Sequence, residues 1–516
     1  MPSPSVAADR ERSGETGRYI RGSGLLMGGR GISLLLNLAV QVLIVRYLSK
    51  SDYGAFAYGL GIASIGSSFL LLGLDKATSR FVPIYQERGE EGKAFGTIAL
   101  AAGIIWGLGL TVVLLVYGTR GLLEVTAVND PLSLSLVLVL IALAPVQAFD
   151  SLLQNVMAVF VGAKAIFLRR HVVGPGLKLA AVLLVIGLSG DVFLLAYGYL
   201  AGGVIGIALY LWILIRTWHR RGLLSHLSPA RLELPTREVL GYSLPLLSSV
   251  LISLLAGSFA VVILEYYHGT RAVAEFRAVL PIARLNIVAL QSFSMLFIPL
   301  ASRMFARNEQ EGLNDLYWRT ATWIAVLTFP IFAVTFSLAE PLTILLFGAE
   351  YAGSAALLSI LALGSYFNAA LGFNAYTLRV YGKVRYIVAI DVVTGLLGLV
   401  ACVLLISRFG AMGAAVGATF TLVLHNLLNH AALLVVDTGV RILDGGFLKM
   451  YLVIAALSGG LLLVQHLLAP PLYVGLALVA ASAIVLLRTA RHALKADETF
   501  PKLLRIPLLR YLVTER

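Results

Sequence analysis

Two arginines and a glutamine share one face of a long apolar stretch. Arg277, Arg284 and Gln291 are spaced by seven residues, which is two helical turns, and Pro281 lies on the same face. A guanidinium group can clamp phosphate oxygens with two parallel hydrogen bonds, and an amide can bond hydroxyls. Pro281 removes a backbone hydrogen bond, so a bend is expected there. This face suits an anionic ligand that carries hydroxyl groups.

A second polar stripe lies near the beginning of the chain. Arg30, Ser33, Asn37 and Gln41 fall at i, i+3, i+7 and i+11, which places them on one face of a helix with a 3.6-residue period. The same chemistry applies to this stripe: one cation and several hydrogen-bonding groups. Both stripes need long helices to hold them.

The composition shows that the surrounding solvent is lipid. The chain has 516 residues, of which 59% are hydrophobic and 13% charged, and its mean hydropathy is +0.89. Soluble domains have a charged fraction of about 25%, and apolar runs of roughly 17–25 residues, enough to cross a bilayer, recur here. The sequence therefore predicts an all-α integral membrane protein. Its net charge of +13 needs no nucleic-acid partner to explain it.

We expect about 14 transmembrane helices, with their ends uncertain by several residues. Their ranges are 24–46, 53–74, 94–117, 132–160, 171–188, 192–216, 237–263, 273–299, 317–338, 354–377, 385–407, 411–436, 448–468 and 472–489.

The positive charge supports this assignment. With the N-terminus inside, the inner segments hold 31 of the 40 Lys and Arg residues, and the outer loops hold five. Both termini are therefore expected in the cytoplasm, with the protein in the plasma (inner) membrane and its basic tail against anionic lipid headgroups. The single cysteine, Cys402, excludes an intrachain disulfide and a thiol-based metal site, and no phosphate-binding loop for ATP is present. No cofactor is expected.

Two internal matches predict a repeat. "NVMAVFVGAK" at 155–164 aligns with "NAYTLRVYGK" at 374–383, and "SRFVPIYQERG" at 79–89 aligns with "SRMFARNEQEG" at 302–312. Both offsets span six helices, so the copies have the same orientation across the membrane, an arrangement typical of transporters that bind substrate between two lobes. The expected parts are a disordered cytosolic arm (1–21), an N-lobe (22–216), a cytosolic inter-lobe loop (217–236), a C-lobe (237–436), two further helices (437–490) and a basic cytosolic tail (491–516).

Longer motifs resemble one transporter family. "LLNLAVQVLIVRYLSKSDYGAFAYG", "LGLDKATSRFVPIYQERG" and "FGAEYAGSAALLSILALGSYFNAALGFNAYTLRVYGK" are similar to the polysaccharide transporter (oligosaccharide flippase) family. Its superfamily also contains the lipid II flippases and the multidrug and toxic-compound extruders. One departure is that Ser258 and Phe259 stand where relatives often carry an Asp-Arg pair.

The resemblance implies that a polyprenyl-(di)phosphate-linked oligosaccharide is flipped from the cytoplasmic to the outer leaflet by alternating access. It also implies membrane lipids as partners, together with polysaccharide polymerase and glycosyltransferases of the same pathway. In such relatives the first, second, seventh and eighth helices line the cavity between the lobes. Similarity to the lipid II flippases, which use cavity arginines on three of these helices, implies roles for Arg30, Arg80 and Arg284.

Each arginine also has a purely structural interpretation. Arg284 lies on the order of 16 Å from the outer end of its span, too deep to reach the headgroups easily. Arg277 is close to Glu275 and the outer boundary, where an interface residue is the simpler reading. Arg30 can extend to the inner headgroups, and Arg80 can orient the chain by its charge alone.

Other polar groups within the spans are expected to be structural. We expect an ion pair between Asp150 and Lys178, and hydrogen-bonded core positions for His425 and His430, whose spacing of five is wrong for metal ligands on one helical face. Asp391 receives no assignment. Glycines spaced by four predict close helix packing at Gly103/Gly107, Gly202/Gly206 and Gly413/Gly417.

Three rival functions remain open. A multidrug cation antiporter shares the fold but would prefer a cavity centred on carboxylates, and Asp150 is the one candidate for such a centre. A membrane glycosyltransferase or polymerase would need acidic residues or a folded module at the membrane face, and the outer loops are short. A scaffold for polymer-assembly enzymes is the third. The flippase interpretation is preferred over these three, and it makes the protein a transporter and no enzyme.

Overall fold

The computed structural model describes residues 29–126, 130–161, 163–224, 232–243, 259–371, 373–436 and 445–494. All regular structure within these ranges is helical. In this part of the chain, eleven helices are long and apolar enough to cross a membrane, or twelve if one bent pair is counted as a span. The all-α, multi-pass membrane fold is confirmed, and the count of 14 stays a prediction.

Several expected segments lie outside the described residues. They are the arm at 1–21, residues 225–231 of the inter-lobe loop, much of the expected helix over 237–263, Ser258 and most of the basic tail.

Contacts within the chain divide it into two compact units. Unit 1 consists of Met1–Leu254 and Gly269–Ala274, and unit 2 consists of Leu255–His268 and Glu275–Arg516. The finer division into arm, lobes, loop, terminal helices and tail remains a prediction.

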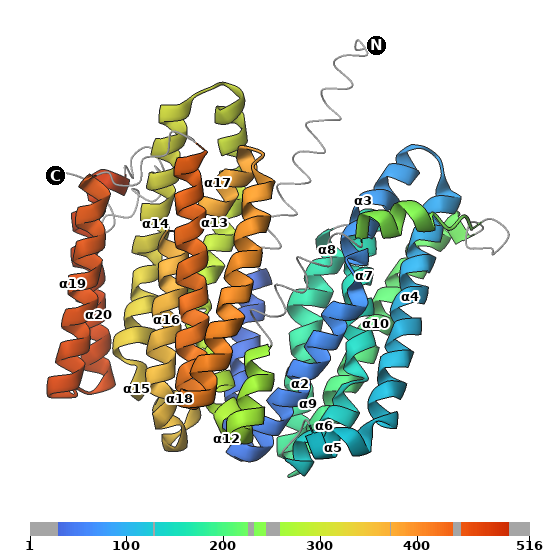
Figure 1. The fold of residues 1–516 in the computed structure, drawn as a ribbon, viewed down its shortest axis with the longest axis horizontal. Coiled ribbons are helices and arrows are strands. Elements are labelled where there is room, and N and C mark those ends of the chain that lie inside the picture. The colour runs from blue at the N-terminus through green and yellow to red at the C-terminus, as the bar shows by residue number, and fades with distance from the viewer. Residues whose placement is uncertain are drawn as a thin grey trace. The chain divides into compact units, whose positions relative to one another are not determined.

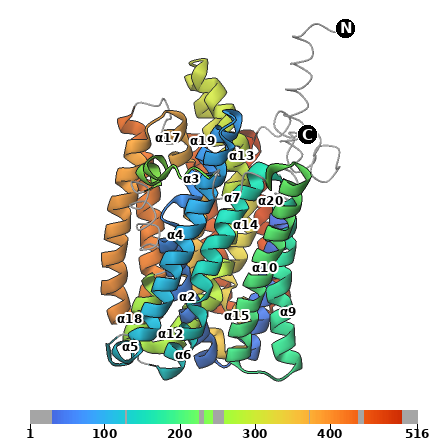
Figure 2. The same cartoon turned by 90° about the vertical axis from the view of Figure 1, so that its right-hand side faces the viewer.

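Unit 1 is a bundle in which the long helices lie side by side (Figure 1, Figure 2). Side-chain oxygens cap three of these helices: Ser49 accepts from the Asp52 N–H at 3.1 Å, Asp130 from the Ser133 N–H at 3.2 Å, and Asp191 from the Leu194 N–H at 3.0 Å. The elements are a helix over Gly29–Tyr47, α2 (Lys50–Leu71), α3 (Leu74–Glu87), α4 (Glu91–Gly118), α5 (Arg120–Thr126), α6 (Pro131–Leu140), α7 (Leu143–Phe160), α8 (Ala163–Ile166), the π-helix η1 (Phe167–Val173), α9 (Gly174–Gly187) and α10 (Val192–Arg220).

Unit 2 is a second bundle, in which α14, α16, α18, α19 and α20 lie side by side (Figure 1). Aromatic rings fill its interior, with Phe332 stacked on Tyr366 at a centroid distance of 4.1 Å. The elements are α12 (Phe259–Ala283), of which Gly269–Ala274 belongs to unit 1, α13 (Leu285–Ala306), α14 (Gln310–Ser337), α15 (Ala339–Phe347), the 3-10 helix η3 (Ala349–Ser354), α16 (Ala355–Ala370), α17 (Asn374–Val380), α18 (Val384–Val435), α19 (Gly445–Leu468) and α20 (Leu472–Leu494).

The 52 residues of α18 form a hairpin of two helices. Gly410 has φ 56° and ψ −132°, a conformation open essentially to glycine alone, and the chain reverses there. A Cβ added to Gly413 would lie 2.0 Å from the Leu405 carbonyl oxygen, and one on Gly417 would lie 2.9 Å from the Cys402 sulfur. The expected helices over 385–407 and 411–436 therefore form an antiparallel pair, and the predicted close packing at Gly413/Gly417 is confirmed.

Candidate functional site

The polar stripe over residues 277–291 occupies the accessible face of its helix. Arg284 and Gln291 are exposed and Arg277 is half-buried, whereas Ala283 and Asn286, on other faces, are completely buried. A lipid-facing stripe would be apolar, because a charged side chain at the bilayer centre costs roughly 2.5–3.5 kcal/mol or more. The alternation of polar exposed and buried residues therefore favours a water-filled chamber on this side of the helix.

The backbone is interrupted at Arg284. The helix α12 ends at Ala283, Arg284 adopts φ −87° and ψ 1°, and α13 begins at Leu285. Pro281, one turn earlier, has no N–H to donate, so the helix is interrupted close to the residue where a bend was expected. A larger bend of 43° comes later, between the segments Phe259–Ser294 and Phe297–Ala306.

The guanidinium of Arg284 makes no hydrogen bond or ion pair with any described residue. This is the arrangement expected of a ligand-binding arginine, since a structural one in a membrane span would be paired. The exposed fraction of its side chain excludes a dry, packed seam. Anion binding by Arg284 stays a prediction.

The first-helix stripe is partly satisfied within unit 1. Asn37, which is exposed, donates to the Ser33 carbonyl oxygen at 2.6 Å, and Gln41 donates to the Tyr53 hydroxyl at 2.5 Å. Arg30 is half-buried. Gln41 therefore has a structural role in joining the first helix to α2, while Arg30 and Asn37 keep accessible polar surface.

Arg80 is exposed in the middle of α3 and lies against aromatic rings. Its guanidinium carbon is 4.7 Å from the centroid of Tyr242 and 5.7 Å from that of Phe81. Cation–π contacts of this kind are worth roughly 0.5–1 kcal/mol at exposed sites and leave the N–H groups at the edge available. Anion binding by Arg80 stays a prediction.

Unit 1 also contains a polar cavity of about 500 Å³. Asp150 on α7 lies in its wall and forms an ion pair with Arg169 of η1, whose Nη2 is 2.8 Å from Oδ1. The expected pair between Asp150 and Lys178 is therefore wrong, because the long side chain of Arg169 reaches the carboxylate instead. Lys178 lines the same cavity, with its ammonium 5.7 Å from the ring centroid of Tyr199.

Glycines make room for Arg169. A Cβ on Gly206 of α10 would lie 1.9 Å from Nη2 of Arg169, and one on Gly174 would lie 2.7 Å from Nη1. The guanidinium is also 5.5 Å from the ring centroid of Tyr210. The two glycines of the Gly202/Gly206 pair therefore have different neighbours. Gly206 makes space for the charged side chain of Arg169, whereas Gly202 faces the Leu177 Cβ of a neighbouring helix at an ordinary contact distance of 3.5 Å.

Arg169 is a functional candidate that its sequence position did not reveal, because it falls among the loop charges expected to orient the chain. Its side chain is only 10% exposed. The available signal was a carboxylate in one span together with a glycine in another, next to a basic loop. The π-helical turn over Phe167–Val173 changes the direction of the side chains, and such turns occur frequently at functional sites.

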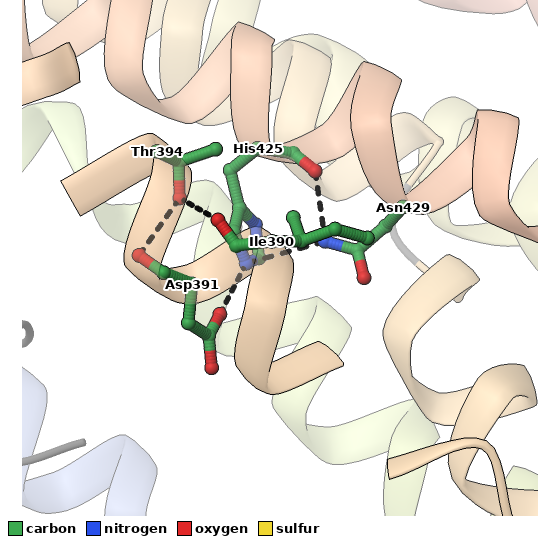
Figure 3. A network of polar contacts seen from close by, with 5 residues as sticks. All are labelled: Ile390, Asp391, Thr394, His425 and Asn429. Carbon is green, nitrogen blue, oxygen red and sulfur yellow. Dashed lines mark hydrogen bonds and ion pairs between the residues drawn. The ribbon is translucent and has the colours of Figure 1, made fainter. Parts of the chain in front are cut away.

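In unit 2 the halves of α18 are joined by an acid–histidine pair (Figure 3). Nε2 of His425 is 2.9 Å from Oδ1 of Asp391, and the amide of Asn429 donates to the His425 carbonyl oxygen at 2.8 Å. His430 lies 3.3 Å from Oδ1 of Asn374. The prediction that both histidines are hydrogen-bonded is confirmed, and Asp391 acquires the structural role that it lacked.

Asn374 organises a buried network in the same unit. It is 1% exposed, accepts from the Tyr317 hydroxyl, and donates to the carbonyl and side-chain oxygens of Asn426 at 3.1 and 3.0 Å. Asn155, its counterpart in the predicted repeat, instead donates to the Asp75 carbonyl at 3.2 Å. Beside this network lies an apolar cavity of about 640 Å³, lined chiefly by aromatic and aliphatic side chains of α14, α16, α18 and α19.

A sequence profile for a family described as polysaccharide biosynthesis protein matches residues 19–305. The chain belongs to this family. The predicted relationship to polysaccharide transporters is therefore confirmed. An uncharacterised membrane protein of Methanocaldococcus jannaschii is 23% identical over 222 residues, a stretch that spans 40% of this chain and 43% of that protein. The match thus covers less than half of the relative's length.

Solved structures share the fold of this polysaccharide biosynthesis protein. The lipid II flippase MurJ in an inward closed conformation is 14% identical with a TM-score of 0.67, covering 93% of this chain and 100% of its own. An inward-facing multidrug resistance MATE transporter of the MOP superfamily is 18% identical with a TM-score of 0.64, covering 77% and 92%. These identities show the fold alone. The protein is a multi-pass membrane protein of the polysaccharide biosynthesis family.

Proposed function

We propose that this protein flips a polyprenyl-(di)phosphate-linked oligosaccharide from the cytoplasmic to the outer leaflet of the plasma membrane. Two lobes open alternately to each side, and the headgroup crosses while the polyprenyl tail stays in lipid. Both termini lie in the cytoplasm, where the polymerase and glycosyltransferases of the same pathway supply or extend the glycan.

The observation that carries this proposal is that the guanidinium of Arg284, on the accessible face of a membrane helix, has no hydrogen bond or ion pair with any described residue. A cation in this position needs an anionic partner, and a lipid diphosphate presents oxygens that one guanidinium binds bidentately. Arg277 and Gln291 extend the same face along the helix axis by about 10 Å on either side of Arg284. Their donors suit the remaining phosphate oxygens and the hydroxyls of the sugars.

Arg30 and Asn37 provide matching donors on the first helix, and Arg80 adds a cation in the middle of α3. In the proposed mechanism these groups receive the headgroup from the cytoplasmic side, and Arg284 holds its charge at the middle of the bilayer. Moving two negative charges outward across 100 mV releases roughly 4–5 kcal/mol, at about 2.3 per charge, so the membrane potential is a sufficient energy source.

The antiporter alternative is weaker because its key carboxylate is engaged. A cation antiporter needs an acidic group that is free to exchange protons and substrate, whereas Asp150 is bound by Arg169 at 2.8 Å and by Gln154 at 3.0 Å. The chemistry of the two stripes is cationic, which favours an anionic headgroup.

The experiment is a flipping assay in proteoliposomes that contain a polyprenyl diphosphate disaccharide. Arg284→Ala should lower the initial rate roughly 10- to 100-fold, the range expected for losing a hydrogen bond to a charged group, and Arg284→Lys should recover part of it. Arg216→Ala is the matched control, because Arg216 is exposed on α10 and contacts Trp212. Flipping by Arg284→Ala at the rate of this control would refute the proposed role.

A further inference from the structure

The polar cavity of unit 1 carries an excess of positive charge. Its lining contains one carboxylate, Asp150, and three cations, Arg169, Arg170 and Lys178, among the residues that the structure describes. With every group ionised, the wall has a net charge of +2. Such a charge inside a membrane domain calls for a counter-ion.

Asp150 does not neutralise Lys178. One carboxylate oxygen accepts from Arg169 at 2.8 Å, and the other accepts from Gln154 at 3.0 Å. Lys178 is exposed to the cavity and makes no hydrogen bond or ion pair with the described part of the chain, where its ammonium lies against the ring face of Tyr199. Lys178 therefore lines the cavity near a carboxylate whose hydrogen bonds go to Arg169 and Gln154.

The size of the cavity and its uncharged lining residues indicate which class of ligand its cationic groups can bind. About 500 Å³ lies within the range of small-molecule sites and far exceeds the needs of a single ion. Gln147, Ser64 and Ser67 add amide and hydroxyl groups that can bond hydroxyls or water. Among the described lining residues, the wall thus combines two cations outside the Asp150 ion pair, Arg170 and Lys178, with neutral hydrogen-bonding groups.

We infer that this cavity is a binding site for a singly charged anionic group, held by the ammonium of Lys178. Arg170 supports it electrostatically, and the Asp150–Arg169 pair forms a fixed wall. The chemistry is shared by a free inorganic anion such as chloride and by the carboxylate of an acidic sugar; the second source rests on the proposed flipping of glycans. This site is distinct from the stripe that carries Arg284.

The test measures binding of radioactive chloride to the purified protein in detergent. Lys178→Met should bind chloride roughly 10- to 100-fold more weakly, the range expected for losing a charged hydrogen-bond donor. Lys76→Met is the matched control, because Lys76 is an exposed lysine on α3 outside the cavity lining. Asp150→Asn removes the one negative charge among the described lining residues and should bind chloride at least as tightly as the unaltered protein.

Crystals soaked in sodium bromide provide a second measurement that needs no variant. Anomalous scattering should place a bromide beside Nζ of Lys178 in the unaltered protein. Equal chloride binding by Lys178→Met and Lys76→Met, or bromide found only elsewhere, would overturn the inference. Weaker chloride binding by Asp150→Asn than by the unaltered protein would also count against it.

Sugar glycosides separate the two sources of the anion. If methyl glucuronide displaces chloride and methyl glucoside does not, the site accepts acidic sugars; if only inorganic anions displace chloride, it is an ion site. Both results require Lys178. The outcome is independent of the flipping assay: failure to flip any lipid-linked glycan would refute the proposed function while leaving chloride binding intact.

Discussion

The Asp150–Arg169 pair depends on a single glycine, which gives a sharp prediction. Gly206→Ala places a Cβ 1.9 Å from Nη2, 2.3 Å from Cζ and 2.5 Å from Nε of Arg169. No small rotation relieves three clashes on one planar group, so the guanidinium must leave Asp150. Gly202→Ala is the matched control, since it lies one turn earlier on α10 and its nearest neighbour is 3.5 Å away.

The magnitude follows from two opposing effects. Breaking a buried ion pair costs about 3–5 kcal/mol, but the cavity lets water reach the separated groups, whose side chains are 10% and 21% exposed, so about 2–3 kcal/mol is expected. Replacing glycine with alanine within a helix returns up to about 1 kcal/mol, and it does so in both variants. Gly206→Ala should therefore unfold at a free energy about 2–3 kcal/mol lower than Gly202→Ala.

The assay is reversible unfolding by titration with sodium dodecyl sulfate, followed by circular dichroism. The same pair of glycine substitutions is repeated in an Asp150→Asn background, where the ion pair no longer exists and the difference should shrink to below about 1 kcal/mol. Equal stability of Gly206→Ala and Gly202→Ala would refute the reasoning. A difference of unchanged size in the Asp150→Asn background would show that the ion pair is not its source.

Three further predictions concern unit 2. In a Cys402→Ala background, Arg284→Cys should react with a membrane-impermeant thiol reagent in purified protein while Ala283→Cys, completely buried, should not; equal labelling would contradict the accessible face. Asn374→Ala should lower the free energy of unfolding by about 1–3 kcal/mol, because it leaves buried partners unsatisfied, and a loss below about 0.5 kcal/mol in the same titration would count against the network. Gly410→Ala should cost about 1–3 kcal/mol through its φ of 56°, and unchanged stability would mean that the hairpin turn tolerates a Cβ.

Hydropathy and helix starts were predictable because each depends on residues that are neighbours in the sequence. The spans expected to begin at 132 and 192 do begin there, since Asp130 and Asp191 cap α6 and α10. The family was also recognisable from motifs that extend over much of the chain. The number of spans depends in part on residues 244–258, outside the described ranges.

Glycine spacing was a poorer guide because it does not say what faces the glycine. The pair Gly413/Gly417 does face a neighbouring helix, whereas a Cβ on Gly103 or Gly107 would meet no atom within 4 Å in the structure as described. The close packing predicted at Gly103/Gly107 is therefore wrong. Spacing of four residues places both glycines on one face of a helix, but the partner comes from the tertiary fold.

The candidate site was predictable in part, because the sequence period shows which residues share a helix face but not which residues of other elements meet them. Periodicity placed Arg277, Arg284 and Gln291 on one face, and that face is the accessible one. Periodicity could not find the partner of Asp150, because Arg169 reaches it from a π-helical turn whose side chains depart from the 3.6-residue repeat. Whether the stripes of the first and eighth helices line one chamber stays a prediction.

The two arginines show how a membrane protein separates structural from ligand-binding charge. Arg169 is enclosed by a carboxylate, an aromatic ring and the space above Gly206, and its Nη2 is bonded to Asp150 within the protein. Arg284 has the same chemistry and a comparable cost of insertion, yet it stands exposed at a break between two helices with no protein partner among the described residues. Because the bilayer penalises an unsatisfied cation, Arg284 is retained most readily if something outside the protein supplies its negative charge for part of a transport cycle. A phosphate-bearing headgroup meets that requirement, and an acidic side chain at the same place would prevent it from binding.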